Sequence, residues 1–198
     1  MVCIFDTSNS RRCRELREVF RRSYVPCAVK EYEKISDSLV NIFFSDTAWL
    51  FDYKIKKLDP ESVLILDTRM KVYELEKTRI FNSVFDILYV KYGIVPSSYS
   101  YKRFSQIGKD TLYCGRYLLL TETENMILRY ISICEGRWCK AEEIVAYCLD
   151  DGADKHTVAV HVSNIVEKSL KRTLVPIITS KQNYGYKIYD AVIRHTEE

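Results

Sequence analysis

The sequence predicts two domains of different fold class: an α/β domain with a parallel sheet over residues 1–95, and an α+β domain over residues 109–190. Short apolar runs alternate with helix-patterned stretches in the first half, whereas the second half has three amphipathic helices followed by a hairpin. Charge is divided as well. Residues 122–154 hold three basic and eight acidic residues, and residues 155–187 hold six Lys/Arg and one acid. The net charge of +3 hides this polarity, which suits one face of the second domain to a polyanion such as nucleic acid.

Length and composition set the broad class of protein. A chain of 198 residues can form two small domains, each with its own core. No apolar run approaches the roughly 20 residues of a membrane span, and the N-terminus lacks the charge order of a signal peptide. We therefore expect a cytoplasmic protein with no membrane partner. The seven cysteines form no C-x-x-C pair and read as reduced core residues, while a redox or metal role for the closest pair, Cys134 and Cys139, stays open.

Five apolar runs in the first half are expected to be strands: Val2–Phe5, Val25–Tyr32, Ile42–Phe44, Val63–Leu66 and Ile87–Val90. Three stretches between them have helical spacing: Asn9–Arg22, Thr47–Lys57 and Lys71–Val84. Strands that are apolar throughout are buried on both faces. The alternation therefore predicts a parallel sheet covered by helices on both sides.

The second half begins after a Ser- and Tyr-rich stretch, residues 96–108, which we expect to be a linker. Thr111–Leu120 reads as a hairpin with its turn at Cys114-Gly115-Arg116. Thr121 and Glu124 form a capping box that starts the first helix, and Lys140–Leu149 is the second. Asp154 caps a third helix that ends near Arg172, and a second hairpin follows it. Residues 191–198 form a tail.

The third helix has two distinct faces. Its apolar face, at 100° per residue, contains Val158, Val162, Ile165 and Ser169. The opposite face contains His156, Val160, Ser163, Asn164, Glu167 and Lys171. A helix of this size is about 28 Å long and can lie in a major groove, where Asn pairs with adenine, Ser contacts several base edges and Val contacts a thymine methyl. The cations suited to phosphates are Lys168, Lys171, Arg172, Lys181 and Lys187.

These residues give the second domain a resemblance to a known family. Leu118–Tyr186 resembles the winged-helix effector domain of OmpR/PhoB-type response regulators, through LLLTETENMIL, AEEI, TVAVHVSNI and IITS…YGYKI in that order. The resemblance implies a third helix in the major groove and a wing in the adjacent minor groove. It places His156, His161, Ser163, Asn164 and Val166, with Thr179 and Lys181 of the wing, at DNA-contacting positions. Ser163, Asn164, Val166 and Glu167 stand where Arg and Lys are common, so the preferred DNA sequence cannot be carried over.

The first domain resembles a shortened, degenerate receiver domain, which has a flavodoxin-like fold. The resemblance places a phosphoacceptor at Asp46, with Asp6, Thr68 and Lys91 around it, and Mg²⁺ at Asp6 and Asp46 if the site is active. Receivers carry two adjacent acids after the first strand, whereas here Asp6 is followed by Thr7. We therefore expect a receiver-like domain that works without conventional aspartyl phosphorylation.

The function expected from the sequence is a sequence-specific transcriptional regulator that binds double-stranded DNA, acts as a homodimer, contacts RNA polymerase and needs no cofactor. There is no Gly-rich phosphate loop, clustered Cys/His set or nucleophile motif, so we do not expect an enzyme. Two alternatives remain. One is a protein-interaction adaptor whose winged helix does not bind DNA, and the other is a phosphorylation-dependent two-component response regulator.

Overall fold

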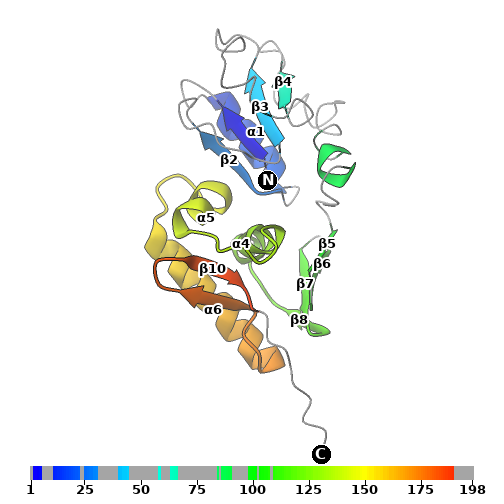
Figure 1. The fold of residues 1–198 in the computed structure, drawn as a ribbon, viewed down its shortest axis with the longest axis vertical. Coiled ribbons are helices and arrows are strands. Elements are labelled where there is room, and N and C mark those ends of the chain that lie inside the picture. The colour runs from blue at the N-terminus through cyan, green and yellow to red at the C-terminus, as the bar shows by residue number, and fades with distance from the viewer. Residues whose placement is uncertain are drawn as a thin grey trace, which may run out of the picture.

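The fold has a parallel α/β part, a small antiparallel sheet, and a C-terminal part of three helices and a hairpin (Figure 1). The structure is a computed structural model, which describes residues 2–5, 11–22, 25–30, 40–44, 58, 63–66, 84, 86–90, 98–101, 103–107 and 109–189. The expected helix Thr47–Lys57, most of the expected helix Lys71–Val84 and the tail 191–198 lie outside the described residues.

The N-terminal part is built on a parallel sheet. Its strands are β1 (Val2–Phe5), β2 (Cys27–Lys30), β3 (Val40–Phe44) and β4 (Val63–Leu66), in the order β2-β1-β3-β4. All three pairings are parallel, and α1 (Arg11–Arg22) connects β1 to β2. This confirms the predicted parallel α/β domain, and the strand order is that of the first four strands of a flavodoxin-like sheet.

The two faces of this sheet contact different parts of the protein. Val2, Ile4 and Ile42 pack in one apolar cluster with Leu16 and Phe20 of α1. The residues of the other face belong to a second cluster, which continues into the C-terminal helices: Cys3, Phe5, Ala28 and Phe43. Successive side chains of a strand point to opposite faces, so the alternation in sequence divides the core in two. The N-terminal part therefore shares an apolar core with the C-terminal part.

One expected strand is a helix. The run Ile87–Val90 lies in a described helical segment, residues 86–90, so its prediction as the fifth strand was wrong. Val84 and Leu88 are buried four residues apart, as one face of a helix requires, and the two residues after Leu88 are exposed. A four-residue apolar run can form either a buried strand or part of a short helix, and its composition alone does not distinguish the two.

The expected linker, residues 96–108, also needs correction. It contains two strands, β5 (Ser98–Tyr101) and β6 (Phe104–Ile107). These pair antiparallel with β7 (Asp110–Tyr113) and β8 (Arg116–Leu118) in a four-stranded sheet of order β5-β6-β7-β8. The hairpin expected at residues 111–120 is confirmed as β7 and β8.

The strand character of β6 is hidden in the sequence because one inward position is polar. Phe104 and Gln106 both point inward and are fully buried. The amide nitrogen of Gln106 donates to Oδ1 of Asn125 at 3.0 Å, and its amide oxygen accepts from Nε of Arg129 at 2.5 Å. These bonds satisfy a buried polar side chain, so a strand with little apolar pattern packs against the first C-terminal helix.

The C-terminal part is a winged helix. It consists of α4 (Glu122–Ile133), α5 (Ala141–Cys148) and α6 (Lys155–Thr173), followed by the antiparallel hairpin β9 (Ile178–Lys181) and β10 (Gly185–Ile188). The hairpin, called the wing below, lies beside α6 (Figure 1). The capping box at the start of α4 is confirmed: Thr121 Oγ1 accepts from Glu124 N, and Glu124 Oε2 accepts from Thr121 N at 2.7 Å.

Candidate nucleic-acid interface

The outward face of α6 is the surface on which the expected base contacts lie. Val158, Val162, Ile165 and Ser169 are buried, as the helical period predicts. The opposite side leaves the following residues exposed: His156, Val160, Ser163, Asn164, Glu167, Lys171 and Arg172. Among these residues Val160 is the large apolar one, and its side chain is 46% exposed. The face is therefore mostly polar and is open from His156 to Arg172.

The start of α6 is fixed by its cap. Asp154 Oδ1 accepts from the backbone N–H of Thr157 at 2.8 Å and from the Thr157 hydroxyl at 2.9 Å. The hydrogen bond from the Thr157 backbone lowers the pKa of Asp154, with the hydroxyl adding to the effect, so the cap is ionised at neutral pH. A carboxylate at a helix N-terminus also interacts favourably with the helix dipole. The cap therefore defines the residue at which the outward face begins.

Lys168 and His161, both expected to contact DNA, are less exposed than the outward face. The ammonium of Lys168 turns back toward α4 and lies 2.6 Å from Oε2 of Glu124, a carboxylate that is almost completely buried. Lys168 is thus paired within the fold, and we expect it to contribute less to DNA binding than the more exposed Lys171. His161 is half-buried at the border between the two faces, as its place in the helical period predicts.

Glu167 is the one acid on the outward face, and it is paired. Its carboxylate lies 2.5 Å from Nζ of Lys171, one turn later on the same face. The hydrogen bond from Lys171 lowers the pKa of Glu167, which remains ionised. The pair cancels most of the local charge, so the positive charge of the surface depends on Arg172 at the end of α6 and on residues beyond the helix.

The wing supplies part of that charge. Thr179 lies opposite Lys187, and Lys181 lies opposite Gly185, in the register of β9 and β10. The ammonium of Lys181 lies 4.1 Å from the centre of the Tyr184 ring, and that of Lys187 lies 4.8 Å from the Trp138 ring. Both distances are in the range of cation–π contacts. Lys181 is exposed, whereas Thr179 and Lys187 are half-buried.

The wing is anchored at Gly185. The backbones of Cys139 and Tyr186 exchange two hydrogen bonds, of 2.8 and 2.9 Å, so the segment before α5 pairs with β10. Gly185 has φ of +109°, and a Cβ placed there would lie 2.0 Å from the carbonyl oxygen of Cys139. Only glycine fits both conditions. This is the physical reason for the Gly-Tyr sequence in the wing.

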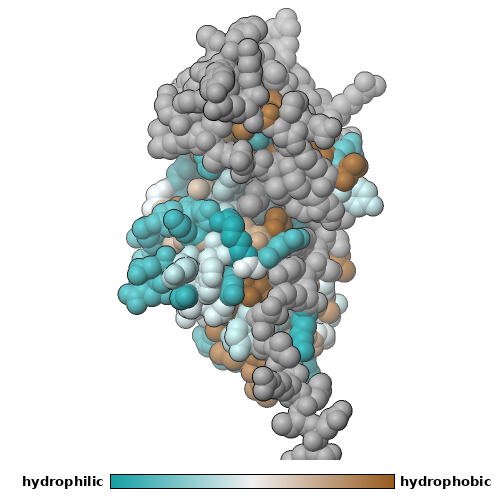
Figure 2. Space-filling model, in the orientation of Figure 1, coloured by the Kyte–Doolittle hydropathy of each residue, from teal (hydrophilic) through white to brown (hydrophobic). Residues whose placement is uncertain are grey.

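A hollow of about 530 Å³ lies between the wing and the first turns of α5 and α6. Its lining includes three lysines, namely Lys140, Lys155 and Lys181. Lys155 is paired with Glu142 at 2.5 Å. Figure 2 shows hydrophilic residues gathered on this side of the molecule, over the tip of the wing and the adjoining helix starts. Neither Lys140 nor Lys155 was predicted from the sequence as a site residue. Lys140 comes close to the wing only because the neighbouring Cys139 pairs with β10, and both lysines line the same hollow.

The expected phosphoacceptor site cannot be placed in the same way. Asp6, Asp46, Thr68 and Lys91 all lie outside the described residues. The residues immediately before Lys91 form a helix and not the strand that a receiver would have there. Within the described part of the chain, no group of three or more Asp, Glu, His or Cys side chains could hold a metal ion. Its helices are also all too short or too polar to cross a membrane.

Comparison with known proteins adds a likeness in fold. No family model matches the chain, and no curated protein matches it. Among solved structures, it is similar to the DNA-binding domain of the response regulator AdeR in complex with an intercistronic region, at 21% identity and a TM-score of 0.42 over 47% of this chain and 100% of that one. DrrB, an OmpR/PhoB homologue from Thermotoga maritima, is 13% identical with a TM-score of 0.43, over 96% of this chain and 98% of that one. The DNA-binding domain of CpxR from E. coli is 19% identical with a TM-score of 0.37, over 46% of this chain and 94% of that one.

Proposed function

We propose that this protein is a transcriptional regulator that binds specific sequences of double-stranded DNA through α6 and the wing. The observation that carries the proposal is the outward face of α6. It is exposed and polar from His156 to Arg172, and it ends in basic residues. A basic hairpin lies beside it. A helix with this combination matches the width and chemistry of the major groove.

The roles on this face follow from side-chain chemistry. Asn164 is placed to donate to and accept from one adenine, and Ser163 to contact a neighbouring base edge. Val160 offers an apolar contact for a thymine methyl. His156 and His161 flank this group, and the cations around it bind phosphates and fix the register on the duplex: Lys171, Arg172, Lys181, Lys187, Lys140 and Lys155. Thr179 contributes a hydroxyl on the wing.

We also propose that the protein binds as a homodimer. A single winged helix of this size contacts a limited stretch of DNA, and two half-sites multiply the preference for the correct sequence over random DNA. Analytical ultracentrifugation with and without a two-site duplex tests this proposal. Binding of one protomer to each duplex at saturation would contradict it.

Regulation of this protein is proposed not to require aspartyl phosphorylation. Two observations support this. Asp6 is followed by Thr7, where a second carboxylate would help to hold Mg²⁺, and the segment before Lys91 is helical. Beryllofluoride with Mg²⁺, which mimics a phosphoryl group on aspartate, should leave both the DNA affinity and the oligomeric state unchanged. An increase in affinity with the mimic would instead identify a phosphorylation-dependent response regulator.

The test of DNA recognition starts from duplexes selected by the purified full-length protein from a random pool. Fluorescence anisotropy then compares the selected duplex with a scrambled one over a range of salt. We expect a steep fall in affinity with salt and a clear preference for the selected duplex. Asn164→Ala should lose most of the preference by weakening binding to the selected duplex about five- to a hundredfold. An equal loss of affinity for the selected and the scrambled duplex would show that Asn164 does not read a base.

The main rival function is a protein-interaction adaptor. Glu167 on the outward face favours it, since an acid there repels phosphates, but its pairing with Lys171 weakens the argument. The adaptor hypothesis predicts that no duplex is enriched by selection and that binding to DNA is negligible at low salt. That result would overturn the proposed function.

A further inference from the structure

The C-terminal end of α5 is completed by a helix of the N-terminal domain. An α-helix leaves its last carbonyl groups without partners inside the helix. Leu149 follows α5 in an extended conformation and donates its N–H to Val145 O, which satisfies one of them. The carbonyls of Ala146, Cys148 and Leu149 accept hydrogen bonds from α1, which is more than 120 residues earlier in the chain.

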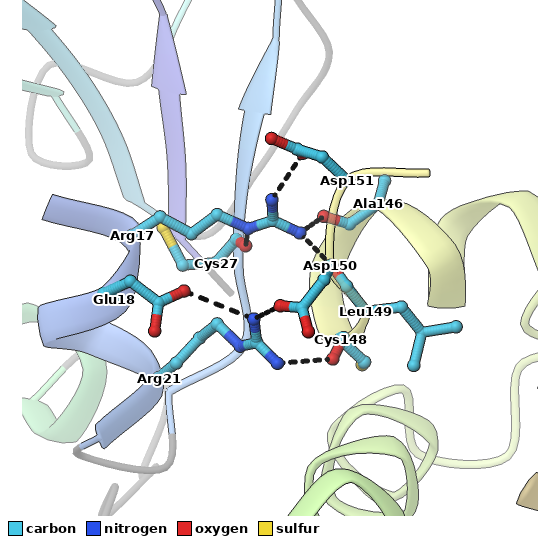
Figure 3. Close-up of polar contacts among 9 residues, drawn as sticks. All are labelled: Arg17, Glu18, Arg21, Cys27, Ala146, Cys148, Leu149, Asp150 and Asp151. Carbon is cyan, nitrogen blue, oxygen red and sulfur yellow. Dashed lines mark hydrogen bonds and ion pairs between the residues drawn. The ribbon is translucent and has the colours of Figure 1, made fainter. Parts of the chain in front are cut away.

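Arg17 makes the central contact (Figure 3). Its Nη2 donates to the carbonyl oxygen of Ala146 at 3.2 Å and to that of Leu149, and its Nη1 lies 3.1 Å from Oδ1 of Asp151. Its Nε donates to the carbonyl oxygen of Cys27 in β2 at 3.2 Å. Arg17 is only 8% exposed. One guanidinium thus joins the edge of the N-terminal sheet, the end of α5 and the turn after it.

Arg21, one turn later on α1, makes a second set of contacts. Its Nη2 donates to the carbonyl oxygen of Cys148 at 3.2 Å. Its Nη1 binds Oδ1 of Asp150 and lies 3.3 Å from Oε1 of Glu18 (Figure 3). The fork geometry of guanidinium suits such multiple acceptors, and cations are also favourable at the negative end of a helix dipole. We call Arg17 and Arg21, with their acceptors on residues 146–151, the arginine clamp.

The clamp holds the short turn that leads into the proposed recognition helix. Asp150 and Asp151 are the first residues of that turn, and Asp154, which caps α6, is its last. The carbonyl of Asp150 accepts from the N–H of Ala153 at 3.1 Å, so a displacement of Asp150 is passed along the turn to the cap. The clamp does not cover the DNA-reading surface, because the outward residues of α6 remain exposed.

Other contacts make the attachment broad enough to be stiff. β2 is an edge strand of the parallel sheet, and α5 packs against it. The ammonium of Lys30 in β2 lies 5.3 Å from the centre of the Tyr147 ring in α5. The face of the sheet with Phe5 and Phe43 also shares an apolar cluster with the C-terminal helices. The interface is therefore held together by apolar contacts, and the directional hydrogen bonds of the clamp fix its orientation.

We propose that Arg17 and Arg21 are positioning residues for DNA recognition: through the clamp, the N-terminal domain fixes the angle between α5 and α6. This inference rests on the proposed function of α6. In this proposal the N-terminal domain affects DNA binding by positioning α6, without covering the DNA-binding face. A change in α1 or β2 is passed to the start of α6 through the clamp, and the affinity for specific DNA changes with it.

The experiment uses the full-length protein and the selected duplex described above. Arg17→Ala and Arg21→Ala are compared with Arg11→Ala, an exposed residue of the same helix whose ion pair is with Glu15 of α1. We expect the two clamp variants to bind the selected duplex at least about fivefold more weakly, with little change on scrambled duplex, while Arg11→Ala resembles the wild type. Arg17→Lys keeps the charge but loses the fork, and should resemble Arg17→Ala.

Hydrogen exchange on the DNA-free proteins separates positioning from loss of fold. In the clamp variants, the amides of residues 149–157 should exchange faster, while those of β1 and of the middle of α4 stay protected. Should Arg17→Ala fail to fold, Arg21→Ala and Asp150→Asn carry the test. Normal exchange or unchanged preference for the selected duplex in the clamp variants would overturn the inference and leave the proposed function standing. A wild-type protein that binds no DNA would overturn both.

Discussion

Lys168 and Glu124 form an ion pair that joins α6 to the first turn of α4, with 2.6 Å between Nζ and Oε2. Glu124 is almost completely buried and also completes the capping box with Thr121. One carboxylate thus caps the start of α4 and forms an ion pair with the C-terminal half of α6. A lysine that belongs to the basic segment in the sequence is, in the fold, part of the packing between two helices.

Replacing Glu124 should destabilise the protein. Glu124→Gln keeps the shape and can still accept from Thr121 N, but it leaves Lys168 without its counter-charge. We expect the free energy of unfolding to fall by about 1–2 kcal/mol, less than for a fully buried pair because Lys168 is partly exposed. Urea denaturation followed by circular dichroism measures it. Glu122→Gln, an exposed acid in the same turn, is the control, and equal effects of the two changes would contradict the role of the pair.

The same ion pair predicts a difference between two lysines of α6 in DNA binding. Lys171 is exposed on the outward face and its partner Glu167 is exposed too, so phosphate can replace that partner. Lys171→Ala should therefore weaken binding to every duplex and lower the slope of log affinity against log salt by about one unit. Lys168→Ala should leave that slope unchanged, since its ammonium is held by the buried carboxylate of Glu124. Anisotropy titrations at several salt concentrations give both slopes. A lower slope for Lys168→Ala would show that Lys168 does contact DNA phosphates.

Gly185 should be the least replaceable glycine among those of the described turns. In Gly185→Ala the alanine must adopt a φ of +109°, and its Cβ would lie 2.0 Å from the carbonyl oxygen of Cys139. Gly115 has a φ of +73°, and a Cβ added there would meet nothing within 4 Å, so Gly115→Ala is the matched control for backbone strain alone. We expect Gly185→Ala to destabilise the protein by about 1–3 kcal/mol more than the control and to detach the wing. Thermal denaturation and the exchange rate of the Tyr186 amide report the two effects.

Cys134 should be the first of the core thiols to react with an alkylating agent. A hydrogen bond with the Cys139 thiol lowers the pKa of Cys134, and the nearby Arg137 charge lowers it further. Burial raises the pKa of Cys27 and of Cys148, both completely buried. Because the thiolate is the reactive form, iodoacetamide at neutral pH should modify Cys134 well before those two. Mass spectrometry of digested protein gives the order, and Arg137→Ala should slow the reaction at Cys134.

Acid should weaken the arginine clamp. The hydrogen bond from Arg21, together with its charge, lowers the pKa of Asp150 below its ordinary value of 3.8. A group whose pKa is lowered by folding stabilises the folded state above its unfolded pKa, and this contribution is lost as the pH falls through the folded value. The contribution of Asp150 should thus be complete at neutral pH, begin to decline below about pH 4 and be lost as the pH falls through the lowered folded value. The free energies of unfolding of wild type and Asp150→Asn, measured from neutral pH into this acid range, should approach each other as the pH falls, and curves that stay parallel would contradict the linkage.

Features encoded locally could be predicted from the sequence. The two faces of α6, its cap at Asp154 and the capping box at Thr121 depend on spacings within one or two turns, and all three are found as expected. Each strand of the parallel sheet is likewise marked by its own continuous apolar run. Such features depend on the chain within a dozen residues.

Features that depend on distant partners could not be predicted. The helix at residues 86–90 and the strand β6 have compositions that fit several structures, and Gln106 is buried only because Asn125 and Arg129 meet it. Lys168 points inward because of Glu124. Arg17 and Arg21 read as exposed helix residues, since their acceptors on α5 are backbone carbonyls that leave no trace in the amino-acid pattern.

Under the proposed function, the pairing of Cys139 with Tyr186 has a consequence for the shape of a bound duplex. Because β10 is paired with β9 on one edge and bridged to Cys139 on the other, the two-stranded ribbon of the wing is tied to the segment before α5 and cannot swing freely. Only its tip, residues 182–184, is left to adjust. A groove that is too narrow or too wide for the ribbon must then itself deform, and flexible base steps at that place would be favoured without any contact to their edges.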